Sequence, residues 1–305
     1  MSKHLLTFYT RTPLHVGCGT SVDVIDLPIM RERITNFPVI PGSSLKGVLL
    51  QAAREHFENA AHARSKDSIP AEAKLLFGTI DTEGEGESKK QISNAGCVQI
   101  MEAKLLAFPV RSLAGCFAWI TCPSVLERYQ RDTGKTFTIS PVEKDHVIAG
   151  SDLIANDQIV LEEYPLTLTK DASITDIATA LKSATNDPLW SSKLEKRLAL
   201  VHDEIFQHLV TSCTEVVTRI AINPATRTVK GSDGGGGGAL FNQENVPCEA
   251  LFYSVLSVLL PRRETTTAAD DHLAALLKAN PTLQVGGDET VGHGLCELNH
   301  EKLQS

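Results

Sequence analysis

The spacing of apolar and polar residues predicts that strands and helices alternate along the chain. Two alternating rows of side chains over residues 5–10 are typical of a strand, which ends at a glycine-rich break. Apolar residues over 45–57 recur at helical spacing and leave charged residues on the opposite face, so we expect a helix that packs on a sheet. We also expect paired core strands at 97–108 and 116–121 around a turn at 109–115, and a helix over 123–131.

The second half of the chain continues this pattern less regularly. Residues 192–210 have the spacing of one helix, and residues 215–222 and 239–245 are interpreted as the two strands of a hairpin. Five consecutive glycines, Gly234 to Gly238, place a flexible tip between these strands. A strand at 250–260, a helix at 268–279, a strand at 283–285 and a mobile exposed loop at 81–90 complete the expected elements.

Length and composition indicate a folded protein with a sizeable core. The chain has 305 residues, of which 42% are apolar, enough for one elaborated domain over 1–305 with a less regular insertion at 135–187. No apolar run approaches the ~20 residues of a membrane span, and residues 1–11 lack the apolar segment of a signal peptide, so we expect no membrane contact and a cytoplasmic location. The seven cysteines form no C-x-x-C pair, which predicts free thiols.

Charge is unevenly distributed. The net charge is 29 minus 37, or -8, which argues against a general nucleic-acid binder. Residues 1–66, however, hold eight Lys or Arg against five Asp or Glu, and residues 216–232 hold Arg219, Arg227 and Lys230 with no acid, so each stretch carries +3. If the fold brings the two stretches together they would form a basic track, with scattered surface charge as the commoner alternative.

Two segments carry candidate chemistry. Residues 13–47 combine a histidine, three carboxylates and two arginines with Ser43 and Ser44, which we expect at the N-cap of the helix, and with Lys46 in its first turn. A lysine there opposes the helix dipole, and a bound phosphate would offset that cost; a cap without a ligand is the alternative. Residues 286–294 hold four glycines, which permit close approach to a bulky ligand or serve only as a turn, without the spacing of a dinucleotide-binding loop.

Five motifs in order resemble a known family. The runs are HVGCGTSVDVIDLPIMRE, IPGSSLKG, AKLLAFPVRS with CFAWITCPSVLERY, ALFNQENVPCEALFYSVL, and VGGDETVGHGL. They are similar to the repeated backbone subunit of type III-B CRISPR effector complexes, subunit four of the Cmr set, in the RAMP superfamily. The resemblance covers residues 4–131 and 217–298.

This resemblance implies a fold and a function. The fold it implies is α+β, a modified RRM-like, ferredoxin-type RAMP core with inserted elements and a thumb hairpin at 219–241. Copies of the chain would stack helically along a guide (CRISPR) RNA, together with other Cmr subunits. They would cleave a bound single-stranded target RNA at regular intervals, with a divalent metal ion, magnesium or manganese, as the cofactor.

The resemblance also assigns roles to individual residues. Asp26 corresponds to the aspartate of the family's DLP motif and would hold the metal or act as a base, His15 of the first strand would transfer a proton, and Glu244 would be a second oxygen ligand or acid. A turn cap at Asp26 and a structural histidine at 15 are the alternatives. The RNA-binding residues that it implies are Ser43, Ser44, Lys46, Arg219, Arg227, Lys230, Gly287, Gly292 and His293. His293 stands where arginine is frequent in the family, which weakens the expected guide contact because histidine is mostly neutral at pH 7.

Two hypotheses of different class follow. The first is an RNA-guided endoribonuclease subunit, and the second is a non-catalytic RNA-binding scaffold of the same fold. Asp26 discriminates between them, and its presence favours the enzyme. A third hypothesis, a nuclease that processes guide RNA alone, predicts cleavage of repeat RNA by the isolated chain.

Overall fold

The computed structural model describes residues 2–20, 24–58, 69–83, 90–220, 222, 227, 240–260 and 269–304, with only the backbone of 80–83 and 90–92. The helices are α1 Gly42–Phe57, α2 Ala71–Phe77, α3 Pro123–Thr133, α4 Ser173–Leu181, α5 Pro188–Arg197, α6 Asp203–Ser212 and α7 Ala269–Ala279. The strands are β1 Ser2–Thr10, β2 Val39–Ile40, β3 Gly78–Glu83, β4 Lys90–Ala95, β5 Val98–Ile100, β6 Ala103–Ser112, β7 Cys116–Thr121, β8 His146–Ala149, β9 Gln158–Leu161, β10 Tyr164–Leu168, β11 Leu198–Val201, β12 Glu215–Ile220, β13 Leu240–Asn245, β14 Leu251–Val258, β15 Thr282–Gln284 and β16 Leu295–Leu303.

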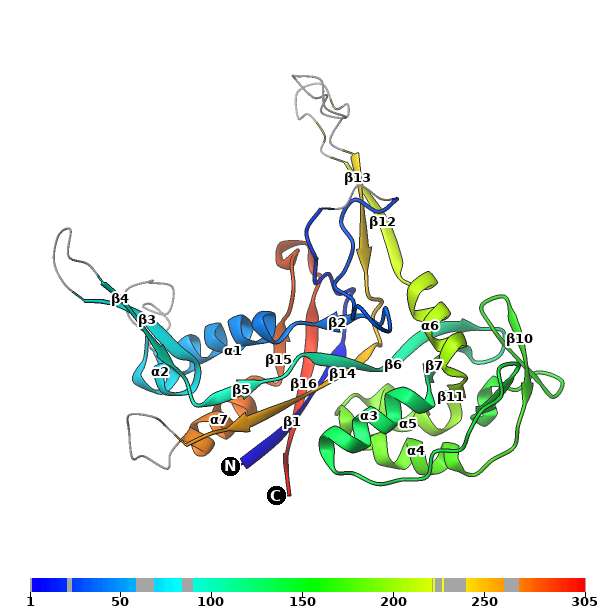
Figure 1. Cartoon of the computed structure of the whole chain (residues 1–305). Coiled ribbons are helices and arrows are strands. Elements are labelled where there is room, and N and C mark those ends of the chain that lie inside the picture. The colour runs from blue at the N-terminus through cyan, green and yellow to red at the C-terminus, as the bar shows by residue number, and fades with distance from the viewer. Residues whose placement is uncertain are drawn as a thin grey trace.

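Within the described residues, a 12-stranded sheet runs through the fold (Figure 1), and the mixed α+β class expected from the sequence is confirmed. Its main path is β15-β16-β1-β14-β6-β7-β11-β8-β10-β9, with β2 on β6 and β5 on β14. Strand β1 pairs antiparallel with β14 and with β16. Every residue from His4 to Thr10 is buried, so both rows of side chains in this strand face protein rather than water.

The helices form two groups, one to each side of β1. In Figure 1, α1, α2 and α7 lie to one side of β1, β14 and β16, and α3 to α6 lie to the other. The apolar face expected for the first helix is confirmed, since Leu45, Leu49, Ala52 and Ala53 of α1 are buried. The proline-initiated helix is confirmed as α3.

The single helix expected over 192–210 is wrong. The segment is α5, then the strand β11, then α6. All four residues of β11 are apolar and buried, and the strand pairs parallel with β7 and antiparallel with β8. The Asp187 carboxylate caps α5 by accepting hydrogen bonds from Leu189 N and Trp190 N, and His202 caps α6 by accepting one from Glu204 N. A fully apolar run between two caps is a buried strand, because it offers no polar face to water.

Two expected loops are shorter than predicted. Residues 81–83 belong to β3, which pairs with β4, so the loop expected at 81–90 is wrong there, and residues 84–89 lie outside the described residues. The turn expected at 109–115 begins only after Ser112, because β6 continues through Pro109, which lies opposite the fully buried Trp119.

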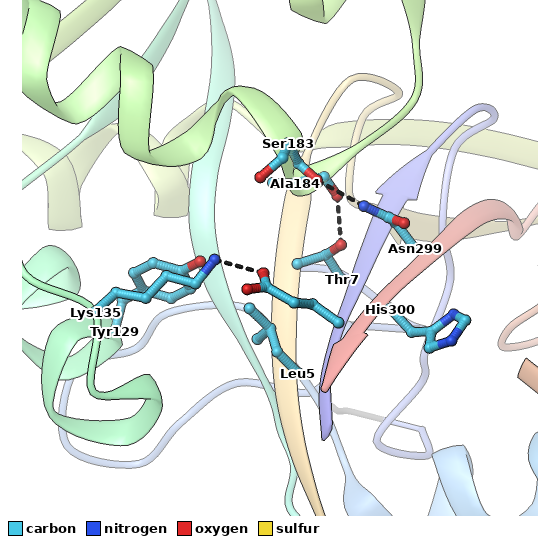
Figure 2. A pocket seen from close by; sticks show the side chains of 9 residues that line it. Leu5, Thr7, Tyr129, Lys135, Ser183, Ala184, Asn299 and His300 are labelled. Atoms are coloured by element: carbon cyan, nitrogen blue, oxygen red, sulfur yellow. Dashed lines mark hydrogen bonds and ion pairs between the residues drawn. The ribbon is translucent and has the colours of Figure 1, made fainter. Parts of the chain in front are cut away.

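Residues 135–187 add three strands, β8, β9 and β10, to the 12-stranded sheet that also contains β1. Strand β8 pairs with β11, and β10 lies between β8 and β9. Figure 2 shows how this region meets β1 and β16: the Thr7 hydroxyl donates to the Ala184 carbonyl, and Asn299 Nδ2 donates to the Ser183 carbonyl at 2.6 Å. The cavity between them is about 10 Å³, which is room for one water at most. The division into one domain with an insertion at 135–187 stays a prediction.

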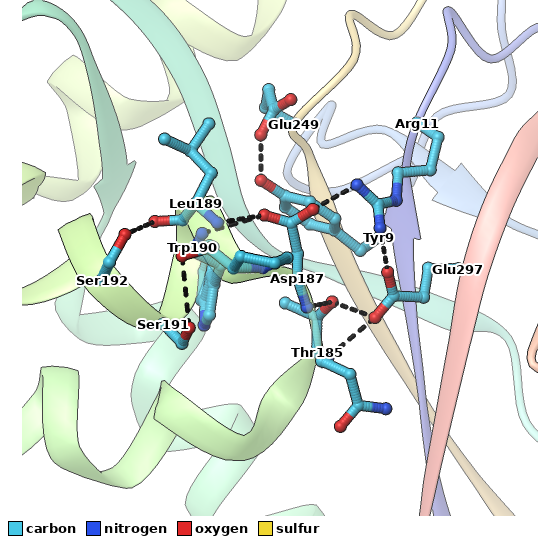
Figure 3. A network of polar contacts seen from close by, with 12 residues as sticks. Tyr9, Arg11, Thr185, Asp187, Leu189, Trp190, Ser191, Ser192, Glu249 and Glu297 are labelled. Atoms are coloured by element: carbon cyan, nitrogen blue, oxygen red, sulfur yellow. Dashed lines mark hydrogen bonds and ion pairs between the residues drawn. The ribbon is translucent and has the colours of Figure 1, made fainter.

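A polar network fixes the same region near the end of β1 (Figure 3). Arg11 is paired with Asp187 and, at 2.6 Å, with Glu297 of β16, whose other oxygen accepts from Thr185 Oγ1 at 2.6 Å. The Tyr9 hydroxyl donates to the Glu249 carboxylate. Burial, followed by the hydrogen bond and charge of Glu249, raises the pKa of Tyr9, so the phenol stays protonated and keeps donating.

The hairpin predicted from the sequence is confirmed as β12 and β13. These strands pair from Glu215 opposite Asn245 to Ile220 opposite Leu240, and they form a two-stranded sheet that projects away from the large one (Figure 1). The glycine run at 234–238 and Lys230 lie outside the described residues. A role of residues 219–241 as a thumb stays a prediction.

The helices and the cysteines of the described part of the chain bear on two further expectations. None of its helices has both the length and the apolar content needed to span a membrane. All seven cysteines are free thiols, as expected.

Candidate functional site

The loop that carries Asp26 lies along the outer edge of β13. Leu27 N donates to Asn242 O at 3.0 Å, and Glu244 N donates to Leu27 O at 3.0 Å, so the loop pairs with the strand through its backbone. Asp26 Oδ2 accepts a hydrogen bond from Asn242 N at 2.7 Å, and the side chain is exposed. This hydrogen bond crosses to another strand rather than closing the turn before Pro28. The carboxylate is therefore held in place while facing solvent.

His15 is attached to the same strand. Its Nδ1 lies 2.7 Å from the Glu244 carbonyl oxygen. Because a carbonyl can only accept, Nδ1 donates, and Nε2 is the nitrogen that can accept or release a proton. An ideal Cβ built on Gly17 would lie 2.7 Å from Nε2, so glycine at this position leaves room for the ring. The expectation that His15 belongs to the first strand is wrong, since β1 ends at Thr10 and His15 lies in the loop that follows.

Glu244 is buried and already has several partners. Its Oε1 accepts from Arg31 Nη2 at 2.6 Å and from Thr214 Oγ1 at 2.8 Å, and its Oε2 accepts from Ile29 N at 3.0 Å. The residue is only 3% exposed. A carboxylate with three donors and little contact with solvent fits poorly as the predicted metal ligand or acid. Its surroundings favour a positioning role, because it holds the loop that follows Asp26 against β13.

The terminal glycine loop meets the base of the hairpin. Arg219 Nη2 of β12 lies 3.5 Å from His293 Nδ1, and Arg219 Nη1 lies 3.1 Å from Asp288 Oδ1. The structure therefore brings together Arg219, His293 and the loop of Gly287 and Gly292, which were predicted as RNA-binding residues far apart in the sequence.

The glycines of this loop permit a close approach to His15. Gly286 has a φ of 78°, and an ideal Cβ on it would lie 2.2 Å from the His15 carbonyl oxygen. Gly287 N donates to the same carbonyl at 2.9 Å. A larger residue at 286 would push His15 away from β13.

Asp288 in this loop was not predicted. It has a φ of 65°, accepts a hydrogen bond from Gln243 and forms an ion pair with Arg219. Burial alone would raise the pKa of Asp288, but the Gln243 hydrogen bond and the Arg219 charge outweigh it and lower that pKa. The sequence signal was a pair of adjacent carboxylates, Asp288 and Glu289, within a glycine loop that is expected to meet RNA.

The start of α1 forms a second candidate group. The expected N-cap role of Ser43 and Ser44 is wrong: Pro41 is the cap residue, without a side-chain cap hydrogen bond, and both serines lie in the first turn. Ser43 and Lys46 are exposed. Among the described residues, no hydrogen bond or ion pair links Ser43, Ser44 or Lys46 to the Asp26 loop or to the glycine loop. Arg227, also exposed, is described without its neighbours.

Among the described residues of this site, Asp26 is the exposed carboxylate that could hold a divalent ion. No group of three or more His, Cys, Asp or Glu side chains suited to a metal occurs among the described residues. Magnesium usually keeps several waters and binds through one or two carboxylates plus substrate phosphates, so a single exposed carboxylate is enough to hold it on the protein side. A cavity of about 670 Å³ lies elsewhere, lined by residues such as Phe117, Glu163 and Cys248 and by none of the predicted site residues. The Asp26 carboxylate itself faces solvent, where a polymer can reach it.

Known proteins are similar to this chain over its full length. The model of the RAMP superfamily matches residues 7–297. The CRISPR system Cmr endoribonuclease Cmr4 of Pyrococcus furiosus is 35% identical over 317 aligned residues, which cover 99% of this chain and 97% of that protein. The CRISPR system CMR subunit Cmr4 of Saccharolobus solfataricus is 27% identical, with 96% and 98% covered.

Solved structures agree with this. The crystal structure of oligomeric Cmr4 from Pyrococcus furiosus has a TM-score of 0.72 and 29% identity, with 100% of both chains covered. A chain in the cryo-EM structure of the type III-B Cmr-beta complex bound to cognate target RNA has a TM-score of 0.70 at 20% identity, covers 98% of this chain and 96% of that one, and shows the shared fold alone.

Proposed function

This chain belongs to the RAMP superfamily, and we propose that it is the repeated backbone subunit of a type III-B CRISPR (Cmr) complex that binds guide RNA and cleaves complementary target RNA. The observation that carries the catalytic part is the placement of Asp26: an exposed carboxylate fixed on β13 by Asn242 N, with His15 attached to the same strand. A scaffold that only binds RNA has no need for a carboxylate on a surface that must accept phosphates.

The target RNA supplies its own nucleophile. Its 2'-hydroxyl attacks the neighbouring phosphorus and the bond to the 5'-oxygen breaks, so the site must align these groups, neutralise developing charge and move two protons. In our proposal Asp26 takes the proton of the 2'-hydroxyl or holds a divalent ion. His15 Nε2 donates a proton to the leaving oxygen. A bound magnesium or manganese ion would supply charge neutralisation at the phosphate. Glu244 keeps the Asp26 loop in place.

Guide binding uses other parts of the chain in our proposal. Ser43, Ser44 and Lys46 at the start of α1 offer hydroxyls, amides and a cation to a phosphate. In the terminal glycine loop the amides of Gly287 and Gly292 already donate to His15 and Glu289, so Arg219 and His293 beside the loop are the groups that we propose for a phosphate. Further copies of this chain and other Cmr subunits are the partners, in keeping with the oligomeric relative, and such a complex acts on transcripts, so we propose a cytoplasmic location.

The substitution Asp26→Asn tests this function. It keeps the size of the side chain and removes the charge, so cleavage by the reconstituted complex should fall by a factor of ~100 to 10,000, or ~3 to 5 kcal/mol, while target affinity changes by less than about tenfold. Single-turnover cleavage and filter binding on one preparation measure both quantities. Asp157→Asn, an exposed aspartate in the turn before β9, is the matched control.

The outcomes separate the enzyme from the scaffold. Normal cleavage by Asp26→Asn would remove Asp26 from the chemistry and favour a non-catalytic scaffold. A joint loss of binding and cleavage would mean that the loop serves RNA binding rather than catalysis.

A further inference from the structure

Two residues of β13 hold the proposed catalytic groups. Asn242 N donates to the Asp26 carboxylate, the Glu244 carbonyl accepts from His15, and the Glu244 carboxylate binds the backbone after Asp26. Any shift of this short segment would therefore move Asp26 and His15 together. The contacts that hold residues 242–244 in place therefore affect the reaction.

Gln243 lies between these two residues and faces the other side of the hairpin. It is 2% exposed, and its Nε2 donates to Asp288 Oδ2 at 2.5 Å and to Asn245 Oδ1 at 3.1 Å. Arg219 lies on the same side, because it is opposite Phe241, two residues along β13. Arg219 Nη1 reaches Asp288 Oδ1 at 3.1 Å. One carboxylate thus binds both strands of the hairpin.

Asp288 is itself fixed to the His15 loop. Its neighbour Gly287 donates to the His15 carbonyl at 2.9 Å, and the backbone of Asp288 is left-handed, with its carbonyl accepting from Val291 N at 3.1 Å and His293 N at 3.2 Å. Aspartate tolerates this conformation better than most residues. The Arg219 guanidinium compensates the negative charge of Asp288, which would otherwise repel an RNA backbone, and Gln243 donates a hydrogen bond to it.

We propose that Asp288 is a positioning residue for target cleavage, which connects the terminal glycine loop to both hairpin strands and thereby holds Asp26 and His15 in their relative places. This inference rests on the proposed function. It assigns Asp288 no contact with the RNA. Asp288 acts through Gln243 and Arg219, and loss of its carboxylate should slow the chemical step more than it weakens RNA binding.

Two substitutions test the proposal in the reconstituted complex. Asp288→Gly keeps the left-handed backbone and removes the carboxylate, and Asp288→Asn keeps shape and one acceptor oxygen but removes the charge. We expect the cleavage rate at saturating target to fall roughly tenfold or more for Asp288→Gly and by less for Asp288→Asn, because small misplacements of reacting groups cost large factors in rate. Guide and target affinities should change by less than about threefold.

Matched controls come from a second aspartate with a similar backbone. Asp157 has a φ of 61° against 65° for Asp288, and it lies in an exposed turn. Asp157→Gly and Asp157→Asn should cleave at the wild-type rate. Gln243→Met removes the amide that Asp288 binds, so combining it with Asp288→Gly should cost little more than the worse single substitution. A loss of general stability would instead add the two effects.

The possible results are distinct. Wild-type cleavage by Asp288→Gly overturns the proposal, as does weaker guide binding with an unchanged cleavage rate, which would make Asp288 part of the guide site. If Asp288→Gly fails to fold, Asp288→Asn decides by the same two readouts. Asp26→Asn is measured alongside: if it cleaves normally, the proposed function fails, whereas an inactive Asp26→Asn with a normal Asp288→Gly removes only the positioning role.

Discussion

At the scale of single residues, identical side-chain chemistry has different uses in different surroundings. Asp26 and Glu244 are both carboxylates at β13, yet Asp26 is exposed and Glu244 is buried among three donors. The sequence predicted both as site residues because it shows residue type and neighbouring motifs. It did not show that the partners of Glu244 come from Arg31, Ile29 and Thr214, since two distant segments must meet before that carboxylate is enclosed.

The buried position of Glu244 leads to a prediction about stability. Glu244→Gln leaves the Arg31 guanidinium, whose side chain is 14% exposed, without its counter-charge, so the free energy of unfolding should fall by about 3 kcal/mol. Denaturant titration measures it. The matched control is Glu301→Gln, where the Glu301 side chain is 51% exposed and its pair with Lys135 should contribute less than about 1 kcal/mol. Equal effects of the two substitutions would contradict the positioning role of Glu244.

The ion pair of Asp132 with Lys104 should make the stability of the protein depend on pH. Lys104 Nζ lies 2.8 Å from Asp132 Oδ2, and Tyr253 donates to the same oxygen at 3.0 Å. Burial alone would raise the pKa of Asp132, but the hydrogen bonds from Lys104 and Arg131 and the Lys104 charge outweigh it, so this pKa is lowered on folding. The folded state then binds fewer protons than the unfolded state, and the stabilisation is complete above the ordinary aspartate pKa near ~4 and lost as pH falls through the folded value.

Asp132→Asn should therefore destabilise the protein most near pH 7, by about 3 kcal/mol, because the buried Lys104 loses its partner. The difference between the variant and the wild type should shrink as pH falls below ~4. Unfolding midpoints measured from pH 7 to pH 3 check this. A difference that is constant across this range would show that the charge of Asp132 does not contribute.

At the scale of elements, local pattern and caps predicted most helices and strands but not their partners. The apolar face of α1 and the proline at the start of α3 were legible, because both depend on residues within one or two turns. β11 was missed, since four apolar residues between two helical patterns look like a continuation of the helix. What makes them a strand is pairing with β7 and β8, which lie far away in the sequence.

The first turn of α1 carries a prediction about guide binding. Lys46 is exposed there, and Lys46→Ala should weaken binding to guide RNA of any sequence and lower the slope of log affinity against log salt by about one, because one phosphate contact is lost. Binding titrations at several salt concentrations measure the slope. Lys278→Ala, an exposed lysine in the last turn of α7, is the control. A loss that depends on guide sequence would contradict a phosphate contact.

At the scale of the whole molecule, the candidate site depends on contacts between the two ends of the chain. Residues 15 and 26 near the start, the hairpin at 215–245 and the glycine loop after β15 meet around β13. Family motifs predicted which residues belong to the site. The joining contacts of Asp288 were not predictable, because they depend on the register of β12 against β13 and on how the glycine loop folds back on His15.

The pairing of the Asp26 loop with β13 also bears on solubility. A two-stranded hairpin has two open edges, and an open edge can pair with another chain and start aggregation. Leu27 occupies the backbone groups of β13 at Asn242 and Glu244, so the loop covers part of one edge of the hairpin. Deleting the loop to abolish cleavage would uncover that edge and invite insoluble assemblies. A point substitution at Asp26 keeps the edge covered.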